Sequence, residues 1–140
     1  MVEAADPLAT LVRLGGDPMS GVHLQPGADE AAIRRMQAAA RRDLGEPVPD
    51  EYVALLRVTN GVQINCAYFK SAEHLVPENL DAPRLEVIVL GNEGTMAEFV
   101  FDRRGQRFHT INMGFPDERF ASFGSFAELL TTVMREQQVL

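Results

Sequence analysis

The spacing of apolar residues predicts two helices near the start of the chain. Residues 7–14 are apolar enough for a short helix, and Gly15-Gly16 provides its stop. Over residues 29–44, apolar side chains recur every three or four positions and face away from four arginines. Gly45 follows at the place where a left-handed C-cap is expected. The pattern therefore predicts helices over 7–14 and 29–44.

Residues 44–61, LGEPVPDEYVALLRVTNG, predict a further helix. Pro49 suits the first turn of a helix, and the two acids after it favour the positive end of the helix dipole. Apolar residues then recur at helical spacing as far as Thr59. Asn60-Gly61 often forms the turn of a hairpin, but here it follows a helical pattern. We therefore expect this pair to end the helix, with a positive φ at one of its two residues.

After Gly61 the apolar period changes to two, which is typical of strands. Residues 62–69 are predicted to form one strand with Cys66 buried on its apolar face. The near-continuous apolar run 84–91 predicts a central strand, with LGNEGT (90–95) as the turn after it.

The last third of the chain predicts a hairpin, a short strand and a helix. Residues 98–102 and 107–111 flank a four-residue connection that contains a glycine, and residues 118–123 resemble a further strand. Ser125 is followed three residues later by Glu128, a capping box that indicates the start of the final helix.

This order of elements predicts an α+β fold, with a mostly antiparallel sheet packed against N-terminal helices and a C-terminal helix. The length of 140 residues suits a single domain over 1–140. The predicted core residues are Pro49, Tyr52, Leu55, Leu56, Val87, Val89, Phe99, Phe101, Phe126, Leu129, Leu130 and Val133.

Composition narrows the compartment and the chemistry. No apolar run approaches the ~20 residues that cross a bilayer, and the acidic start of the chain does not resemble a signal peptide. We therefore expect a cytoplasmic protein that does not contact membranes. The single cysteine, Cys66, excludes a disulfide framework, and the three histidines lack the spacing of metal ligands. Neither a metal nor a cofactor is expected.

Charge is the most informative bulk property. The net charge of −7 argues against nucleic acid as the partner. Residues 71–98 hold six acids against one base, Arg84, and thus carry −5 of that charge. This segment is either a solvated loop face or an acidic surface for a basic partner. Glu86 is set aside because it lies inside the predicted central strand. The candidate partner-binding residues are Glu73, Glu78, Asp81, Glu93 and Glu98.

Motifs of catalysis are weak in this sequence. Ser125 does not lie in a nucleophile elbow, and helix capping accounts for it. LGNEGT lacks both the lysine of a phosphate-binding loop and the third glycine of a dinucleotide fingerprint. We assign no catalytic residue and expect a protein that is not an enzyme.

The phrase at 44–61 resembles the N-terminal signature of the SUKH superfamily. The matching positions are Leu44, Gly45, Val48, Pro49, Tyr52, Leu55, Leu56, Asn60 and Gly61. Three later blocks, 87–94, 99–108 and 120–130, are similar to the strand, hairpin and closing-helix blocks of that superfamily and occur in the same order. The resemblance runs from about Ala28 to the end, so residues 1–25 lie outside it. Asn79-Leu80 and the VIVLG block are most similar to the YrhA-like branch.

The resemblance implies a cytoplasmic, non-enzymatic domain of the kind found in bacterial immunity proteins. Such proteins bind and neutralise a cognate toxin in interbacterial competition, and nucleases are frequent among the toxins. An acidic surface over residues 71–98 would suit a basic nuclease. Two alternatives stay open, namely an intracellular adaptor without a toxin partner and a small ligand-binding protein or enzyme. The sequence predicts neither the identity of the toxin nor the oligomeric state.

Overall fold

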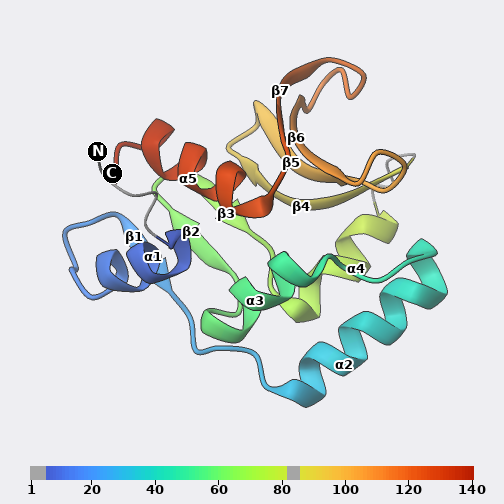
Figure 1. Ribbon diagram of the computed structural model, residues 1–140, viewed down its shortest axis with the longest axis horizontal. Coiled ribbons are helices and arrows are strands. Elements are labelled where there is room, and N and C mark those ends of the chain that lie inside the picture. Colours follow the sequence, from blue (N-terminus) through green and yellow to red (C-terminus); the bar gives the residue numbers. More distant parts are fainter. Residues whose placement is uncertain (1–5, 82–85) are drawn as a thin grey trace.

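The computed structural model describes residues 6–81 and 86–140. Over these residues, five α-helices and one π-helical turn accompany a seven-stranded sheet in which all neighbouring strands are antiparallel (Figure 1). The elements are α1 (Pro7–Gly15), β1 (Val22–Leu24), α2 (Glu30–Ala39), η1 (Ala40–Leu44), α3 (Asp50–Val58), β2 (Val62–Ile64), β3 (Ala67–Phe69), α4 (Ala72–Asp81), β4 (Val87–Glu93), β5 (Ala97–Asp102), β6 (Arg107–Asn112), β7 (Arg119–Phe123) and α5 (Phe126–Glu136). The predicted α+β class is confirmed.

The sheet is a meander, because its strands lie side by side in the order in which they occur along the chain. Helices α1, α3 and α5 contact one another, and α5 also contacts β6 and β7. Helix α2 lies outside this group, against α3 and α4, while α4 contacts β4. Strands β4 to β7 form a strongly curved half of the sheet, visible at the top right of Figure 1.

The first two predicted helices are confirmed, and local chemistry explains their bounds. Asp6 accepts the N–H of Leu8 at the start of α1, and Asp29 accepts the N–H of Ala32 at the start of α2. The second helix ends in the π-helical turn η1, a local widening that the apolar pattern does not reveal. Gly45 then has the predicted left-handed conformation, with φ +89°.

The phrase at 44–61 forms a helix and its exit, as predicted. Helix α3 begins one residue later than expected, because Pro49 is its N-cap rather than part of its first turn. Tyr52 is fully buried, and its hydroxyl lies 2.5 Å from the carbonyl of Lys70. The helix ends at Val58, and Gly61 has φ +87° before β2 begins. The Asn60-Gly61 pair is therefore a helix exit and not the centre of a hairpin.

Replacing Gly61 by valine is expected to lower the free energy of unfolding by about 1–2 kcal/mol or more, since non-glycine residues are strained at this φ. A Cβ atom at Gly61 would also lie only 3.1 Å from the carbonyl oxygen of Phe69. Gly94→Val is the matched control, because Gly94 has φ +52° and open space around its Cβ position. Urea unfolding should show a larger loss for Gly61→Val than for the control. Equal losses would mean that the close approach to Phe69 has no cost.

The single strand predicted over 62–69 is wrong. This segment forms a hairpin in which β2 and β3 pair, with Ile64 opposite Ala67. The two-residue turn between them, Asn65 and Cys66, shifts the alternation of side chains. Cys66 is consequently exposed rather than buried, and Phe69 replaces it in the core. The strand period alone does not reveal this turn, because alternation continues in an apparently unbroken pattern.

The predicted core is largely confirmed, with two corrections. Nine of the twelve predicted residues lie in one cluster of buried side chains shared by helices and sheet, namely Tyr52, Leu55, Leu56, Phe99, Phe101, Phe126, Leu129, Leu130 and Val133. Val87 and Val89 instead pack with Val100 and Ile111 in a separate small cluster. Pro49 is only half-buried, as its N-cap position at the helix end explains.

The C-terminal half follows the predicted order. Strands β5 and β6 form the predicted hairpin, β7 is the last strand, and Ser125 caps α5 by accepting the N–H of Glu128. Two local predictions are wrong. The turn predicted at 90–95 begins only at Gly94, because β4 continues to Glu93. Glu86 precedes β4, has φ +67° and pairs with Arg104 instead of lying inside the strand.

Candidate functional site

Helix α4 lies inside the acidic segment 71–98, for which the sequence pattern predicted loops and strands and no helix. Ser71 begins the helix, since its hydroxyl accepts the N–H of His74. Pro77 lies inside the helix on its exposed side, and this residue conceals the helical pattern. Buried Leu75, Val76 and Asn79 recur at helical spacing after the serine cap. That combination of cap and spacing is the signal by which the helix could have been found.

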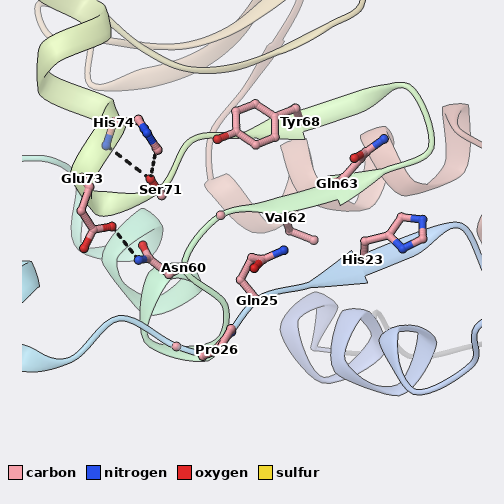
Figure 2. Close-up of a pocket in the computed structure, with 12 residues that line it drawn as sticks. His23, Gln25, Pro26, Asn60, Val62, Gln63, Tyr68, Ser71, Glu73 and His74 are labelled. Carbon is pink, nitrogen blue, oxygen red and sulfur yellow. Dashed lines mark hydrogen bonds between the residues drawn. The ribbon is translucent and has the colours of Figure 1, made fainter.

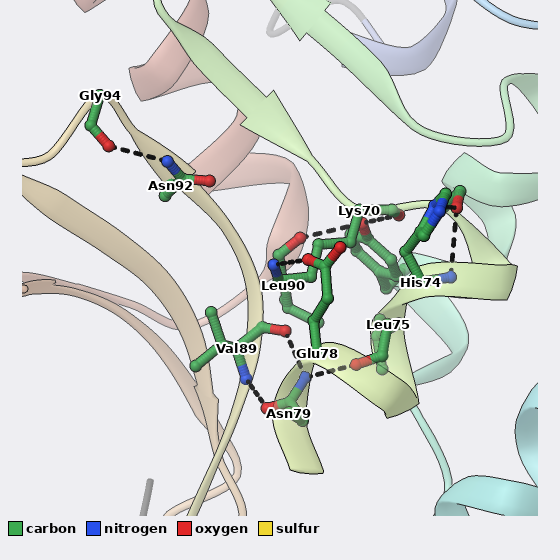
Figure 3. Close-up of polar contacts among 11 residues, drawn as sticks. Lys70, His74, Leu75, Glu78, Asn79, Val89, Leu90, Asn92 and Gly94 are labelled. Carbon is green, nitrogen blue, oxygen red and sulfur yellow. Dashed lines mark hydrogen bonds and ion pairs between the residues drawn. The ribbon is translucent and has the colours of Figure 1, made fainter. Parts of the chain in front are cut away.

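Asn79 joins α4 to the sheet (Figure 3). Its side-chain nitrogen donates to the carbonyls of Leu75 and Val89, at 2.8 and 2.9 Å, and its side-chain oxygen accepts the N–H of Val89 at 2.8 Å. Strand β3 ends at Phe69 and pairs only with residues 91–93 of β4, so Val89 has no strand partner on the β3 side of β4. The amide of Asn79 takes the place of a strand there. It fixes α4 against the sheet.

Asn60 holds the other end of α4. Its side-chain oxygen accepts the N–H of Ala72 at 2.8 Å, and its side-chain nitrogen donates to the Glu73 carboxylate at 2.7 Å. Asn60, the next-to-last residue of the phrase at 44–61, therefore positions Glu73, the first acid of α4. Because both ends of the helix are anchored, its exposed side chains project from a fixed backbone.

A cavity of about 510 Å³, lined mostly by residues with polar side chains, opens beside the start of α4 (Figure 2). His23 and Gln63 from β1 and β2 line one part of it, and Tyr68 from β3 lines another. Glu73 and His74 from α4 complete the wall, with the His74 ring hydrogen-bonded to Ser71 at 2.7 Å. Partial burial, followed by the negative charge of Glu78, raises the pKa of Tyr68, so its hydroxyl stays neutral at physiological pH.

On its other side, α4 borders a groove of about 360 Å³ against α2. Met36, Val76 and Leu80 make this groove predominantly apolar, and the exposed fraction of Leu80 is 48%. Arg35 and Glu73 lie at the edge of the apolar surface. The two cavities share Glu73, so α4 forms a ridge between a polar cavity and an apolar groove. We call this surface, formed by the exposed side chains of α4, the α4 ridge.

The structure separates the five candidate acids. Glu73, Glu78 and Asp81 lie on α4, and Glu78 forms a salt bridge with the largely buried side chain of Lys70. Among the described residues, no salt bridge involves Glu73 or Asp81.

In the β4–β5 hairpin, Glu98 is paired with Asn92 and Glu93 is paired with Ala97. Because paired residues share a face of the sheet and neighbours along a strand alternate, Glu93 and Glu98 project from opposite faces. Glu93 lines a further cavity beside α5. The acidic stretch of sequence is thus not one continuous surface, and only its α4 part adjoins the two cavities described above.

The sequence did not predict the hydrogen-bonded side chains of Asp102, His109 and Ser122. The Nδ1 atom of His109 lies 2.7 Å from the Ser122 hydroxyl, and its Nε2 atom lies 3.4 Å from the Asp102 carboxylate. Cross-strand register brings these residues together across β5, β6 and β7. His109 is 2% exposed, and burial, followed by the positive charge of Arg119, lowers its pKa. Ser122 lines none of the three cavities that adjoin α4 and α5, and we interpret this set of hydrogen bonds as a structural link.

This link is expected to weaken in mild acid. Since the pKa of His109 is lower in the folded state, unfolding takes up a proton as the pH falls below the ordinary histidine value of about 6.5. The contribution of His109 is complete above that value and is lost progressively as the pH falls toward its folded-state pKa. Urea unfolding at about pH 7.5 and 5.5 should show a smaller loss of stability for His109→Gln than for wild type. His23→Gln, at an exposed histidine, should keep the wild-type loss. If His109→Gln loses as much stability between the two pH values as the wild type does, this role of His109 is contradicted.

Two general properties follow from the described residues. Over 6–81 and 86–140, no helix has the length and apolar character needed to cross a membrane. In the same part of the chain, His, Cys, Asp and Glu side chains do not gather in groups of three or more that could hold a metal ion.

No protein-family model and no curated protein sequence matches this chain.

Proposed function

We propose that this protein is an immunity protein that binds a basic protein toxin through the α4 ridge. The proposal places the chain in the SUKH superfamily, in the cytoplasm, without enzymatic activity of its own. The observation that carries it is that α4 presents exposed acids beside an exposed apolar groove, on a helix anchored at Asn60 and Asn79. Protein interfaces combine an apolar centre with a polar rim in this way.

Charge supports a basic partner. Glu73 and Asp81 are exposed acids on α4, and the protein as a whole has a net charge of −7. Exposed carboxylates on a rigid element attract a basic partner during association and oppose the approach of nucleic acid. Nucleases expose basic surfaces to their substrates, and carboxylates can occupy such surfaces in place of phosphates. A nuclease is therefore the toxin class that this surface fits best.

The apolar groove supports a protein rather than a small anion as the partner. Leu80 is nearly half exposed, and it lies where an apolar side chain of a partner would complete the packing between α2 and α4. Arg35 at the groove edge can pair with an acid at the rim of the same partner, whereas Arg42 is already paired with Asp43. The SUKH-like phrase contributes Asn60, whose side chain positions Glu73, so the resemblance and the ridge are joined by this hydrogen bond.

Co-expression with the product of the neighbouring gene tests this function. We expect that product to inhibit growth when expressed alone, and the present protein to restore growth and to co-purify with it. Leu80→Glu should abolish both effects by placing a charge in the groove. Val12→Glu is the matched control, because Val12 is similarly exposed, at 46%, on α1. Absence of binding with wild type would favour the adaptor alternative, and binding that survives Leu80→Glu would assign the interface to another surface.

A further inference from the structure

A second candidate interface lies where α5 meets the curved part of the sheet. The last turns of α5 and strands β4 to β7 enclose a cavity of about 380 Å³. This volume lies within the range of about 300–1,000 Å³ typical of ligand pockets. The cavity shares no lining residue with the two cavities beside the α4 ridge. An inference about it therefore goes beyond the proposed function.

The walls of this cavity combine apolar side chains with two carboxylates. Phe99 and Val133 come from the core, and exposed Met96 and Phe120 lie at the rim. Glu93 from β4 and Glu136 from α5 also line the cavity, and none of the lining residues is basic. The site is therefore negatively charged without an internal counter-charge among its lining residues.

A β-bulge brings Phe120 to the rim. Thr110 pairs with Ala121 and the next residue of β6, Ile111, pairs with Arg119, so Phe120 is the extra residue of β7. Bulges redirect side chains in this way and often occur beside functional sites. The Phe120 side chain is 51% exposed on a strand at the edge of the sheet, an arrangement that soluble proteins usually avoid.

The α5 wall of the cavity is held in place. The side-chain oxygen of Gln137 accepts the N–H of Cys66 at 2.8 Å, and the backbone carbonyl of Gln137 accepts the side-chain amide of Asn65 at 2.7 Å. These contacts tie the end of α5 to the β2–β3 turn. Glu136, one residue earlier, therefore projects from an anchored turn, so less side-chain and backbone freedom is lost when a ligand binds.

We propose that this cavity binds an arginine side chain of a partner protein. A guanidinium group presents donors in a plane and can bond two carboxylates at once, which an ammonium group does less well. Its methylene stem packs on Met96 and Phe120, and its charge is attracted to the aromatic ring. The arginine belongs to a polypeptide, because the exposed side chains of Met96 and Phe120 at the rim offer apolar contacts to neighbouring residues that the free amino acid lacks.

Amide titration by NMR tests this site with N-acetyl-arginine N-methylamide as the probe. We expect saturable shifts at Phe120, Thr110 and Gln137. The citrulline analogue, an uncharged isostere, should bind about tenfold more weakly, and free arginine should also bind more weakly. Glu93→Gln and Glu136→Gln should each weaken binding of the probe about threefold to fivefold, the range of a partly exposed ion pair.

Glu128→Gln is the matched control, because Glu128 is an exposed acid on the same helix that does not line the cavity. It should leave the affinity for the probe unchanged. Equal shifts with the arginine and citrulline probes, shifts located elsewhere, or the same loss in Glu128→Gln as in Glu93→Gln would each overturn the proposal. The α4 ridge takes no part in this titration, so its result is independent of the proposed immunity function.

Discussion

Replacing Asn79 by alanine is expected to lower the free energy of unfolding by about 3–5 kcal/mol. The substitution removes three hydrogen bonds made by a side chain that is only 4% exposed. It also leaves the N–H and the carbonyl of Val89 without a hydrogen-bond partner, because the Asn79 amide is their partner on this side of β4. An unsatisfied buried backbone group costs about 1–3 kcal/mol, so two such groups account for most of the expected loss.

Asn92→Ala is the matched control for this effect. Asn92 is an asparagine on β4 itself. Its side chain is half-buried and makes one hydrogen bond, to the carbonyl of Gly94 (Figure 3). Its loss should cost about 1 kcal/mol or less. Urea unfolding of both variants measures the difference. If Asn79→Ala loses no more stability than Asn92→Ala, the amide of Asn79 does not hold α4 against the sheet.

Elements with a strong local signal were predictable from the sequence. The Gly45 stop and the Ser125 cap each combine with helical spacing, and each lies where predicted. The helix exit at Gly61 was predictable for the same reason, since a residue that tolerates positive φ follows a helical run. In these segments, local preference and tertiary packing agree.

Elements that depend on distant contacts were not predictable. The pairing of β2 with β3 depends on a turn at Asn65-Cys66 that has no glycine to mark it. Helix α4 contains Pro77, and its position depends on hydrogen bonds to Asn60 and Val89, which are remote in the sequence. Val87 and Val89 lie apart from the main core because side chains alternate along β4, and Ile88 and Leu90 face the main core instead. The run VIVL is apolar on both faces, so it does not reveal which face meets the helices.

The candidate site was predictable only in part. Net charge identified the acidic segment, but distance along the chain does not show that Glu78 is paired with Lys70 or that Glu93 faces α5. The groove beside Leu80 is formed with α2, more than thirty residues earlier in the chain. Charge patterning therefore located acids, whereas the fold determines which of them share a surface.

Reversing the charges of Glu73 and Asp81 to lysine is expected to slow association with the basic toxin by about tenfold or more at low salt. The two changes replace two negative charges by two positive ones, a shift of +4 on the exposed side of α4, where attraction would otherwise speed encounter. Neither acid forms a salt bridge among the described residues, and the variant loses only the hydrogen bond from Asn60 to Glu73, while Asn60 still caps Ala72. It should therefore keep most of the stability of the wild type. Asp117→Lys/Glu118→Lys makes the same change of net charge in the exposed β6–β7 connection and should slow association much less.

The measurement that tests the α4 ridge most directly is the rate of association with the neighbouring gene product at two salt concentrations. Between about 0.01 M and 0.15 M salt, the screening length falls from about 30 Å to about 8 Å. The wild-type protein should therefore associate markedly more slowly at the higher concentration. Glu73→Lys/Asp81→Lys should be slow at both, and Asp117→Lys/Glu118→Lys should retain most of the wild-type salt dependence. Association that is independent of salt, with equal rates for wild type and Glu73→Lys/Asp81→Lys, would contradict binding through the α4 ridge.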